Sequence, residues 1–435
     1  FARVLQTMST QADQPNLVLI FSDQQHWQAM GCVDPFFETP TLDRLADESV
    51  MFDHVFCTTP QCSPSRSSML TGLYPHRTGV WNNMGAAGGG ELAQATVGAM
   101  LQAVGYRTGY FGKWHLGDHP LANAGWDARQ IGTDDAATTA AACEFVRQTK
   151  QDHKPFALVV SINDPHDIYY FQQHEGEVRA DEAPLPISWQ RETFANKPAV
   201  QQRFMTADQG KVMQGQPREA WQHYRAWYRE VVRRYDAHVG AVVDALQKAD
   251  AWSDSIVMVT SDHGDMDAHH RLIFKGPFMY EHLVRVPMLV RVPERFGGRG
   301  PGKSSEHVLL TDVVPTWRDF AGLPPIETDG QSLRPLLCEQ TASPWRSRPF
   351  VVGQYYGKQS WVNPLRMLRT ERFKYVLPRQ GMAELYDLIA DPHELDNRAL
   401  DPSSAPMVEE LHAHLERWMQ ANDDPFATLE IAAPE

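Results

Sequence analysis

Two apolar runs that lie far apart in the chain end in closely similar polar triplets. Residues 16–21 lead into Ser22–Gln24, and residues 255–260 lead into Ser261–His263. A continuous apolar run of this kind predicts a strand buried on both faces, as in a parallel sheet covered by helices. Functional residues of open α/β sheets collect at the carboxyl ends of such strands. An Asp after a strand can also simply cap the next helix, but capping alone hardly explains the repetition.

Other segments extend this α/β pattern. Residues 156–162 and 287–292 are further apolar runs that predict strands. Between them, residues 218–249 carry apolar side chains at spacings of three and four, which predicts a long amphipathic helix. We expect the aromatic residues of that helix, Tyr228 and Tyr235 among them, to belong to the core.

The two triplets also suggest a metal site. If the two strands are neighbours, Asp23, Gln24, Asp262 and His263 come together at one edge of the sheet. This set offers mostly oxygen ligands, with one imidazole. We therefore predict a divalent cation at this edge.

Cys62 precedes a predicted helix. Ser63 can act as the N-cap, Pro64 suits the first helical position, and the helix is expected to end near Gly72. The helix dipole, with Arg66 one turn further on, then favours an anion or an anionic nucleophile at position 62. Taken alone, a Cys before a helix is more often an ordinary buried or reactive thiol.

A glycine-bordered loop carries two further candidates. Residues 105–117 predict a short strand that opens into a loop, in which Lys113 and His115 alternate in an extended segment and would point the same way. A surface lysine and a packed histidine are the ordinary alternatives for isolated residues. We also expect Trp81, Asn82, Asn83 and residues 167–171 to line the substrate pocket.

The net charge argues against some classes of binding partner, and the cysteine content argues against some classes of structural site. The formal net charge is -14, which argues against a general surface for nucleic acids or polyanions and places the substrate in a pocket. The five cysteines form no CxxC pair, so neither a disulfide scaffold nor a zinc cluster is expected. No apolar run reaches the roughly 18 residues of a membrane span.

The start of the sequence bears on location. Residues 1–13 lack the basic start and apolar stretch of a signal peptide, and Met8 can serve as the native start. We therefore expect a cytoplasmic protein. A signal peptide trimmed from this sequence would make it periplasmic instead.

The sequence around Cys62 resembles the signature of the formylglycine-dependent sulfatases, in the alkaline phosphatase superfamily. The resemblance rests on Cys62-x-Pro64-Ser65-Arg66, then Leu70-Thr71-Gly72 and Tyr74-Pro75, and on Gly112-Lys113-Trp114-His115-Leu116-Gly117. It implies a large mixed, mostly parallel sheet flanked by helices, with a smaller C-terminal α+β subdomain. The hairpin expected at residues 366–376, the strand at 384–388 and the helix at 407–419 are similar to that subdomain.

These patterns give a domain organisation. We expect a catalytic domain over residues 14–340 and the small subdomain over residues 345–435. Residues 168–217 are polar and lack a clear period, which predicts a long excursion over the site, with a disordered insertion as the alternative.

The resemblance also implies roles for individual residues. Cys62 would be oxidised to formylglycine by a formylglycine-generating enzyme, and its hydrate would attack the sulfur of a sulfate ester. The other implied roles are these: Arg66, Lys113 and His115 hold the hydrate, Lys113, His166, Lys275 and Asn83 bind substrate, His166 protonates the departing alcohol, and Asp23, Gln24, Cys62, Asp262 and His263 bind the metal. Arg271 competes with Lys275 for the place of the second lysine.

The metal segments depart from the commonest sulfatase pattern. Gln24 and His263 stand where many members carry Asp and Asn, which leaves Ca²⁺ as the expected ion and makes Mn²⁺ more competitive. This version is similar to that of phosphonate monoester and phosphodiester hydrolases. We expect hydrolysis of an aryl or carbohydrate sulfate ester, with phosphonate or phosphodiester hydrolysis as one alternative and a noncatalytic anion-binding protein with unmodified Cys62 as another.

Overall fold

The computed structural model describes residues 14–86, 88–117, 125–149, 154–341, 343–358 and 361–428. Met8, on which the expected native start depends, lies outside the described residues. The strands are β1 (Asn16–Asp23), β2 (Val50–Phe56), β3 (Arg107–Gly112), β4 (Ala128–Ile131), β5 (Phe156–Pro165), β6 (Ser255–Ser261), β7 (Arg285–Val286), β8 (Met288–Arg291), β9 (Gly302–Leu309), β10 (Phe350–Lys358), β11 (Trp361–Thr370), β12 (Phe373–Pro378) and β13 (Glu384–Asp387). The α-helices are α1 (Pro40–Ala46), α2 (Cys62–Thr71), α3 (Pro75–Thr78), α4 (Val97–Gln102), α5 (Asp135–Thr149), α6 (Ile187–Arg191), α7 (Ala199–Ala207), α8 (Arg218–Lys248), α9 (Glu281–Val284), α10 (Val313–Phe320), α11 (Arg334–Leu337) and α12 (Ala405–Ala421).

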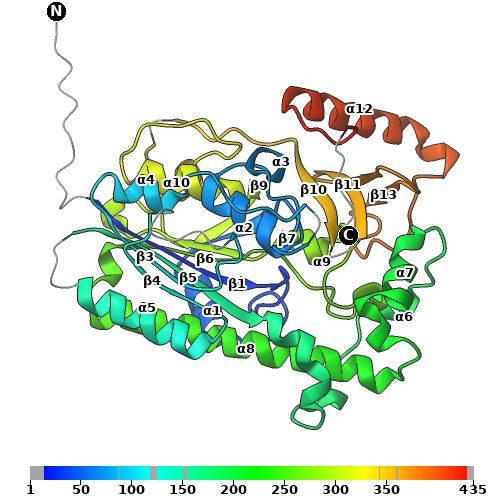
Figure 1. Ribbon diagram of the computed structural model, residues 1–435, viewed down its shortest axis with the longest axis horizontal. Helices are drawn as coiled ribbons and strands as arrows, with labels where there is room; N and C mark the ends of the chain where they lie inside the picture. Colours follow the sequence, from blue (N-terminus) through cyan, green and yellow to red (C-terminus); the bar gives the residue numbers. More distant parts are fainter. Residues whose placement is uncertain are drawn as a thin grey trace, which may run out of the picture.

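A nine-stranded sheet forms the centre of the molecule (Figure 1). Its strand order is β4-β3-β5-β1-β6-β8-β2-β7, with β9 paired to β2. The first five of these strands run parallel, whereas β8 is antiparallel to both β6 and β2. The predicted mixed, mostly parallel sheet is therefore confirmed.

Helices cover both faces of this sheet, as its apolar strands require. Helices α5 and α8 pack on one face, and α2, α4 and α10 form a layer on the other (Figure 1). Along β1, Leu17, Leu19 and Phe21 enter one core cluster, while Val18 and Ile20 enter the opposite one. This alternation explains why the strand is apolar at consecutive positions.

The polar segment at residues 168–217 is ordered, so the alternative of a disordered insertion is wrong. It contains α6, α7 and several short 3₁₀ turns. Phe171, Leu185 and Phe204 pack against Trp221 and Tyr224 of α8 in one hydrophobic cluster. Its scattered apolar residues therefore anchor short elements without a regular period.

The four-stranded antiparallel sheet has the order β10-β11-β12-β13 and lies beside the large sheet (Figure 1). Helix α12 packs against β11 and β12 through Leu411 and Leu415, so the predicted hairpin, third strand and closing helix are confirmed. Gln354 of β10 donates its backbone N–H to Thr58 O, just before α2. Among the described residues, no helix combines the length and the apolar character needed to cross a membrane.

Candidate active site

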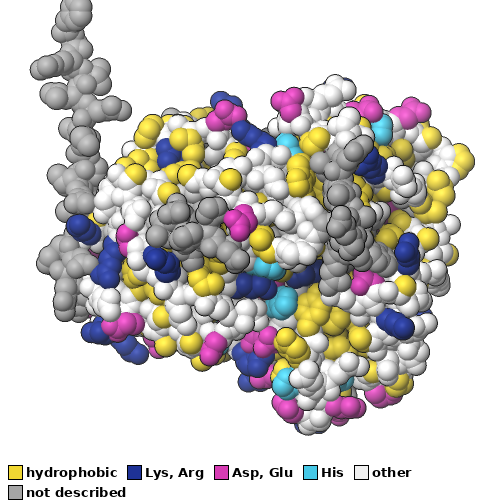
Figure 2. Space-filling model, in the orientation of Figure 1, with side chains coloured by type: hydrophobic (Ala, Val, Ile, Leu, Met, Phe, Trp, Pro, Cys, Tyr) yellow, Lys and Arg dark blue, Asp and Glu magenta, His cyan; other side chains and the backbone are white. Residues whose placement is uncertain are grey.

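The ends of β1 and β6 bring the two polar triplets together. The strands are parallel neighbours in register, with Ser22 opposite Ser261. Gln24 N–H donates to Asp262 Oδ1 at 3.1 Å, which ties one triplet to the other. In the orientation of Figure 1, Figure 2 shows cationic and histidine side chains gathered at the middle of the face, where β1 ends.

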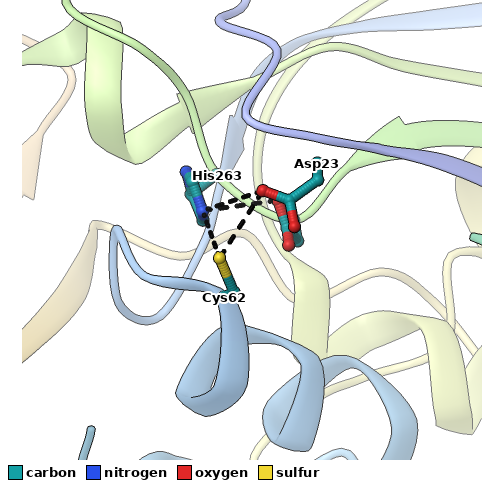
Figure 3. Close-up of side chains that lie close together, drawn as sticks. Asp23, Cys62 and His263 are labelled. Carbon is teal, nitrogen blue, oxygen red and sulfur yellow. Dashed lines mark hydrogen bonds and ion pairs between the residues drawn. The ribbon is translucent and has the colours of Figure 1, made fainter. Parts of the chain in front are cut away.

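Cys62 lies in the first turn of α2 and points at this edge of the sheet. Its Sγ is 3.5 Å from Asp23 Oδ1 and 3.3 Å from His263 Nε2 (Figure 3). One donor atom each of Cys62, Asp23, Asp262 and His263 lies within 4.8 Å of the others, and all four side chains are buried. The helix N-terminus therefore faces a compact set of metal-ligating groups.

The start of α2 differs from the predicted one. The N-cap position belongs to Gln61, so Cys62 is the first helical residue and Ser63 is not the cap. The free N–H of Ser63 instead donates to Asn83 Oδ1 at 3.1 Å. A cap supplied by a residue 20 positions away in sequence is invisible to a rule based on local sequence. The predicted end is confirmed, since Gly72 is the left-handed C-cap with φ of 78°.

Arg66 binds the two carboxylates. Its Nε lies 2.8 Å from Asp262 Oδ2, and an Nη lies 2.9 Å from Asp23 Oδ2. The other Nη donates to Ser161 Oγ at 2.8 Å. Arg66, expected from the sequence to favour an anion at position 62, instead bridges Asp23 and Asp262, because two buried carboxylates bind the guanidinium strongly.

Lys275 occupies the centre of the site. Its Nζ lies 2.7 Å from Gln24 Oε1, 2.9 Å from Cys62 Sγ and 3.0 Å from His263 Nε2. Arg271, the competing cation, points elsewhere, since its Nε donates to Trp189 O. The structure thus brings Lys275 to Cys62 and leaves Arg271 outside the site.

The donor set fits a divalent cation. His263 Nδ1 lies 2.9 Å from Gly264 O, and a carbonyl only accepts, so Nδ1 carries the hydrogen and Nε2 presents a lone pair to the site. With that nitrogen, Gln24 Oε1 and the carboxylates of Asp23 and Asp262 offer a mixed oxygen and nitrogen set. The Lys275 ammonium among these atoms shows that they can surround a positive charge.

Electrostatics distinguish the two carboxyls and favour an anion at Cys62. Burial opposes ionisation of Asp23, but Lys113, Lys275, His166 and Arg66 together hold its pKa well below the usual value. Burial, and then the neighbouring Asp23, raise the pKa of Asp262. For Cys62, burial and Asp23 act upward, yet Lys275, Lys113 and His263 outweigh them and lower the thiol pKa. Asp262 is therefore the more basic carboxyl.

Lys113 and His166 lie near Asp23, and His115 follows in the same loop as Lys113. Lys113 Nζ lies 2.6 Å from Asp23 Oδ2. The predicted extended segment is broken at His115, whose φ is 59°, so the alternation with Lys113 does not hold. His166 directly follows β5, and burial, then Lys113, lower its pKa well below the usual value.

The residues expected to line the pocket lie in different surroundings. Trp81 packs on Tyr356, with ring centroids 4.3 Å apart, and Ile168 and Phe171 belong to the hydrophobic cluster of α8. Asn82 and Asn83 support α2, because Asn82 Oδ1 accepts from Gln61 Nε2 at 2.6 Å and Asn83 Oδ1 accepts from Ser63 N. Tyr169 lies at the site, with its ring centroid 4.9 Å from that of His166 and 5.9 Å from Lys275 Nζ.

Three residues near the site were not predicted from the sequence. Asp265 is fully buried and accepts from Gln24 Nε2 at 2.6 Å, and burial raises its pKa to about 7. Tyr224 of α8 donates to Asp265, and Lys358 of β10 donates to Lys275 O. Burial, and then Lys275, lower the pKa of Lys358 to about 7. Of these three residues, only Asp265 could have been suspected from the sequence, since it stands in the same strand-end segment as Asp262.

Comparison with known proteins identifies relatives of this chain. The family model described as Sulfatase matches residues 15–323, and that described as N-sulphoglucosamine sulphohydrolase, C-terminal, matches residues 269–421. Delta 4,5-hexuronate-2-O-sulfatase of Bacteroides thetaiotaomicron is 27% identical over 97% of this chain and 92% of that protein. N-acetylglucosamine-6-O-sulfatase of the same organism is 26% identical over 94% and 87%.

Solved structures agree in fold. A 2-O GAG sulfatase superposes with a TM-score of 0.85 at 26% identity, covering 97% of this chain and 95% of that one. The phosphonate monoester hydrolase of Agrobacterium radiobacter superposes with a TM-score of 0.77 at 22% identity, covering 95% and 97%. The second likeness extends to the fold alone.

Proposed function

This chain belongs to the sulfatase family and hydrolyses sulfate esters, and we propose that it does so through a formylglycine made from Cys62, on a sulfated saccharide, with Ca²⁺ as its metal. The proposal rests on the atoms around Cys62 Sγ. Lys275 Nζ, His263 Nε2 and Asp23 Oδ1 all lie within hydrogen-bonding or ion-pair distance of it. The relatives support the choice of a sugar, since their names specify a hexuronate and an N-acetylglucosamine.

The two groups that the protein would acquire supply nucleophile and charge. Formylglycine at position 62 supplies an oxygen nucleophile that can be regenerated, which an ordinary serine or cysteine cannot offer. A divalent cation held by Asp23, Gln24, Asp262 and His263 supplies Lewis acidity and offsets charge on the sulfate oxygens.

The protein's own side chains then have separate tasks. Lys113 and Lys275 bind the nonbridging oxygens of the ester, and Arg66 fixes both carboxylates from below. Asp262, which lies beside Cys62 and the other candidate ligands, accepts the proton of the nucleophile. His166 donates a proton from its imidazole to the leaving oxygen. Burial and then Lys113 lower its pKa in the free protein, and the negative charge of a bound sulfate ester acts in the opposite direction. His115 assists release of sulfate as a base.

Hydrolysis of a phosphonate monoester is the second candidate. Gln24 and His263 favour it, because this version of the metal segments is similar to that of phosphonate monoester hydrolases. A phosphonate monoester carries one negative charge, as a sulfate monoester does, so the same cationic side chains can bind either group.

The test compares esters on one preparation. The chain is produced together with a formylglycine-generating enzyme, loaded with Ca²⁺, and assayed on a sulfated disaccharide, an aryl sulfate and an aryl phosphonate, with Cys62→Ala as the control. We expect sulfate release from the saccharide at the highest kcat/KM, and none from the variant. Faster turnover of the phosphonate would replace the proposed substrate, and equal activity of Cys62→Ala would refute the role of position 62.

A further inference from the structure

The Gln24 side chain is held between two groups of opposite hydrogen-bonding character. One end lies 2.7 Å from Lys275 Nζ and the other lies 2.6 Å from Asp265 Oδ2. A lysine ammonium only donates, so the Gln24 atom that faces it must be the amide oxygen. The NH₂ end therefore faces Asp265, and the oxygen faces the cation site.

The other oxygen of Asp265, Oδ1, is fixed as an acceptor. Its Oδ1 accepts from Tyr224 OH at 2.8 Å and from the backbone N–H of Asp267 at 2.7 Å. Tyr224 OH in turn accepts from Phe274 N at 2.9 Å, so its one hydrogen points toward Asp265. A hydrogen-bond chain thus runs from the long helix α8 through Asp265 to Gln24, entirely among buried side chains.

We propose that Asp265 is a positioning residue that fixes the orientation of the Gln24 amide, with its oxygen toward the cation. An amide turned by 180° would occupy the same space and present an NH₂ group to the ion. An ionised Asp265 makes that orientation costly because it would place two acceptors against each other. The inference rests on the proposed function, since it concerns the same cation site, but it assigns a role that the cation ligands themselves do not supply.

The first variant replaces one acceptor atom of Asp265 with a donor and removes one negative charge. In Asp265→Asn, the remaining carboxamide oxygen is needed by both Tyr224 OH and Asp267 N–H, so the new NH₂ group faces Gln24. The Gln24 amide then turns and presents its NH₂ group to the ion. We expect the affinity for Ca²⁺ and for Mn²⁺ to fall by roughly 10- to 100-fold, as is typical for loss of an outer partner of a ligand.

A paired exchange separates orientation from simple loss of charge. Gln24→Glu alone sets two carboxylates 2.6 Å apart and is expected to bind the ion no better than wild type, with a loss of stability. Combined with Asp265→Asn, the Glu carboxylate offers an oxygen to both sides and needs no orientation. The double variant keeps the net charge of the wild type and is expected to bind the ion about 10-fold or more tightly than Asp265→Asn.

The controls address folding. Asp236→Asn removes another buried carboxylate attached to α8, which accepts from Thr41 N and Leu42 N outside the site. It should lower stability and leave metal affinity unchanged. Tyr224→Phe removes one hydrogen bond of the same chain and should weaken metal binding by a smaller factor. If Asp265→Asn fails to fold, this variant tests the proposal in its place.

The measurement is calorimetric titration of each metal-free, full-length variant with CaCl₂ and with MnCl₂. Wild-type affinity in Asp265→Asn, no gain in the double variant, or wild-type affinity in Tyr224→Phe when Asp265→Asn is unfolded would each overturn the proposal. So would a wild-type chain that binds neither ion. Sulfate release is assayed separately, so a chain that binds metal as expected but releases no sulfate would refute the proposed function alone.

Discussion

At the scale of the residue, the site is a nearly balanced set of buried charges. Asp23 and Asp262 face Arg66, Lys113 and Lys275, and the lowered pKa of Cys62 lets its thiolate balance the third cation. With a neutral group at position 62, one positive charge is left over among the side chains, and a bound divalent cation would add two more. A net positive site suits an anionic sulfate ester.

The bridge made by Arg66 predicts a cost for a substitution that keeps the charge. Arg66→Lys leaves at least one carboxylate without its donor, because a single ammonium cannot reproduce the guanidinium fork. We expect the free energy of unfolding to fall by about 1–3 kcal/mol for each acceptor left unpaired. Urea denaturation measures this, with the exposed Arg233→Lys as control. Equal stability of Arg66→Lys and wild type would refute the bridging role.

His166 predicts a dependence on the leaving group. His166→Gln should lower kcat for an alkyl sulfate by about 10²- to 10⁴-fold, because an alkoxide leaves poorly without a proton. For nitrophenyl sulfate, whose leaving group is stable as an anion, the loss should be much smaller. The ratio of the two kcat values measures the effect. A loss by the same factor for both esters would contradict a role in protonation.

At the scale of the element, the site depends on abrupt ends of strands. Gly112 closes β3 directly before Lys113, with φ of 101°. An added Cβ would lie 1.9 Å from Ser161 O of the neighbouring strand β5. The turn that carries Lys113 to Asp23 therefore needs glycine at this position.

Gly112→Ala is accordingly expected to destabilise the protein by at least about 1–3 kcal/mol, from backbone strain alone. It should also displace Lys113 and raise KM for a sulfate ester. Denaturation and steady-state kinetics measure the two effects. Gly132→Ala, at the end of β4, is the matched control, since nothing lies within 4 Å of its added Cβ. A variant at position 112 that resembles this control in both measurements would refute the requirement.

The elements that sequence could predict are those that local patterns determine. The strands at residues 16–23 and 255–261 and the helix at 218–248 follow from apolar runs and periodicity, and so does the meeting of their ends in a parallel sheet. The start of α2 was misplaced because its cap comes from Asn83. Tyr224 and Lys358 were missed because their roles depend on tertiary contacts that have no local pattern.

At the scale of the whole molecule, buried ion pairs connect helix α9, beside the large sheet, to the C-terminal sheet. Glu281 of α9 lies 2.9 Å from Lys374 Nζ of β12 and 3.4 Å from an Nη of Arg369 of β11. Burial opposes ionisation of Glu281, but Lys374, Arg369 and Arg285 outweigh it and lower its pKa. The same contact region holds Lys358 of β10 against the carbonyl of Lys275, so the C-terminal sheet supports the site.

This pairing predicts a defined acid sensitivity. A carboxyl with a lowered pKa in the folded state stabilises the protein above its unfolded-state value of 4.5, and that contribution is lost as the pH falls below it. Glu281→Gln should lower the free energy of unfolding at neutral pH by about 3–5 kcal/mol, because it leaves buried cations unpaired. The variant should then lose less stability than wild type between neutral pH and about pH 4.

Urea denaturation at the two pH values measures this difference, with Glu416→Gln on the exposed side of α12 as control. The control should change stability by no more than about 0.5 kcal/mol. An equal acid dependence in Glu281→Gln and wild type would show that the buried pairs do not carry it.

The central claim is that the side chain at position 62 is the precursor of the nucleophile. The most direct measurement is mass spectrometry of the peptide that contains residue 62, on preparations made with and without a formylglycine-generating enzyme and with sulfate release recorded for each. We predict an aldehyde at position 62 in the active preparations, in a fraction that rises in proportion to sulfate release. An unmodified thiol in every chain of a preparation that releases sulfate at the full rate would contradict the account.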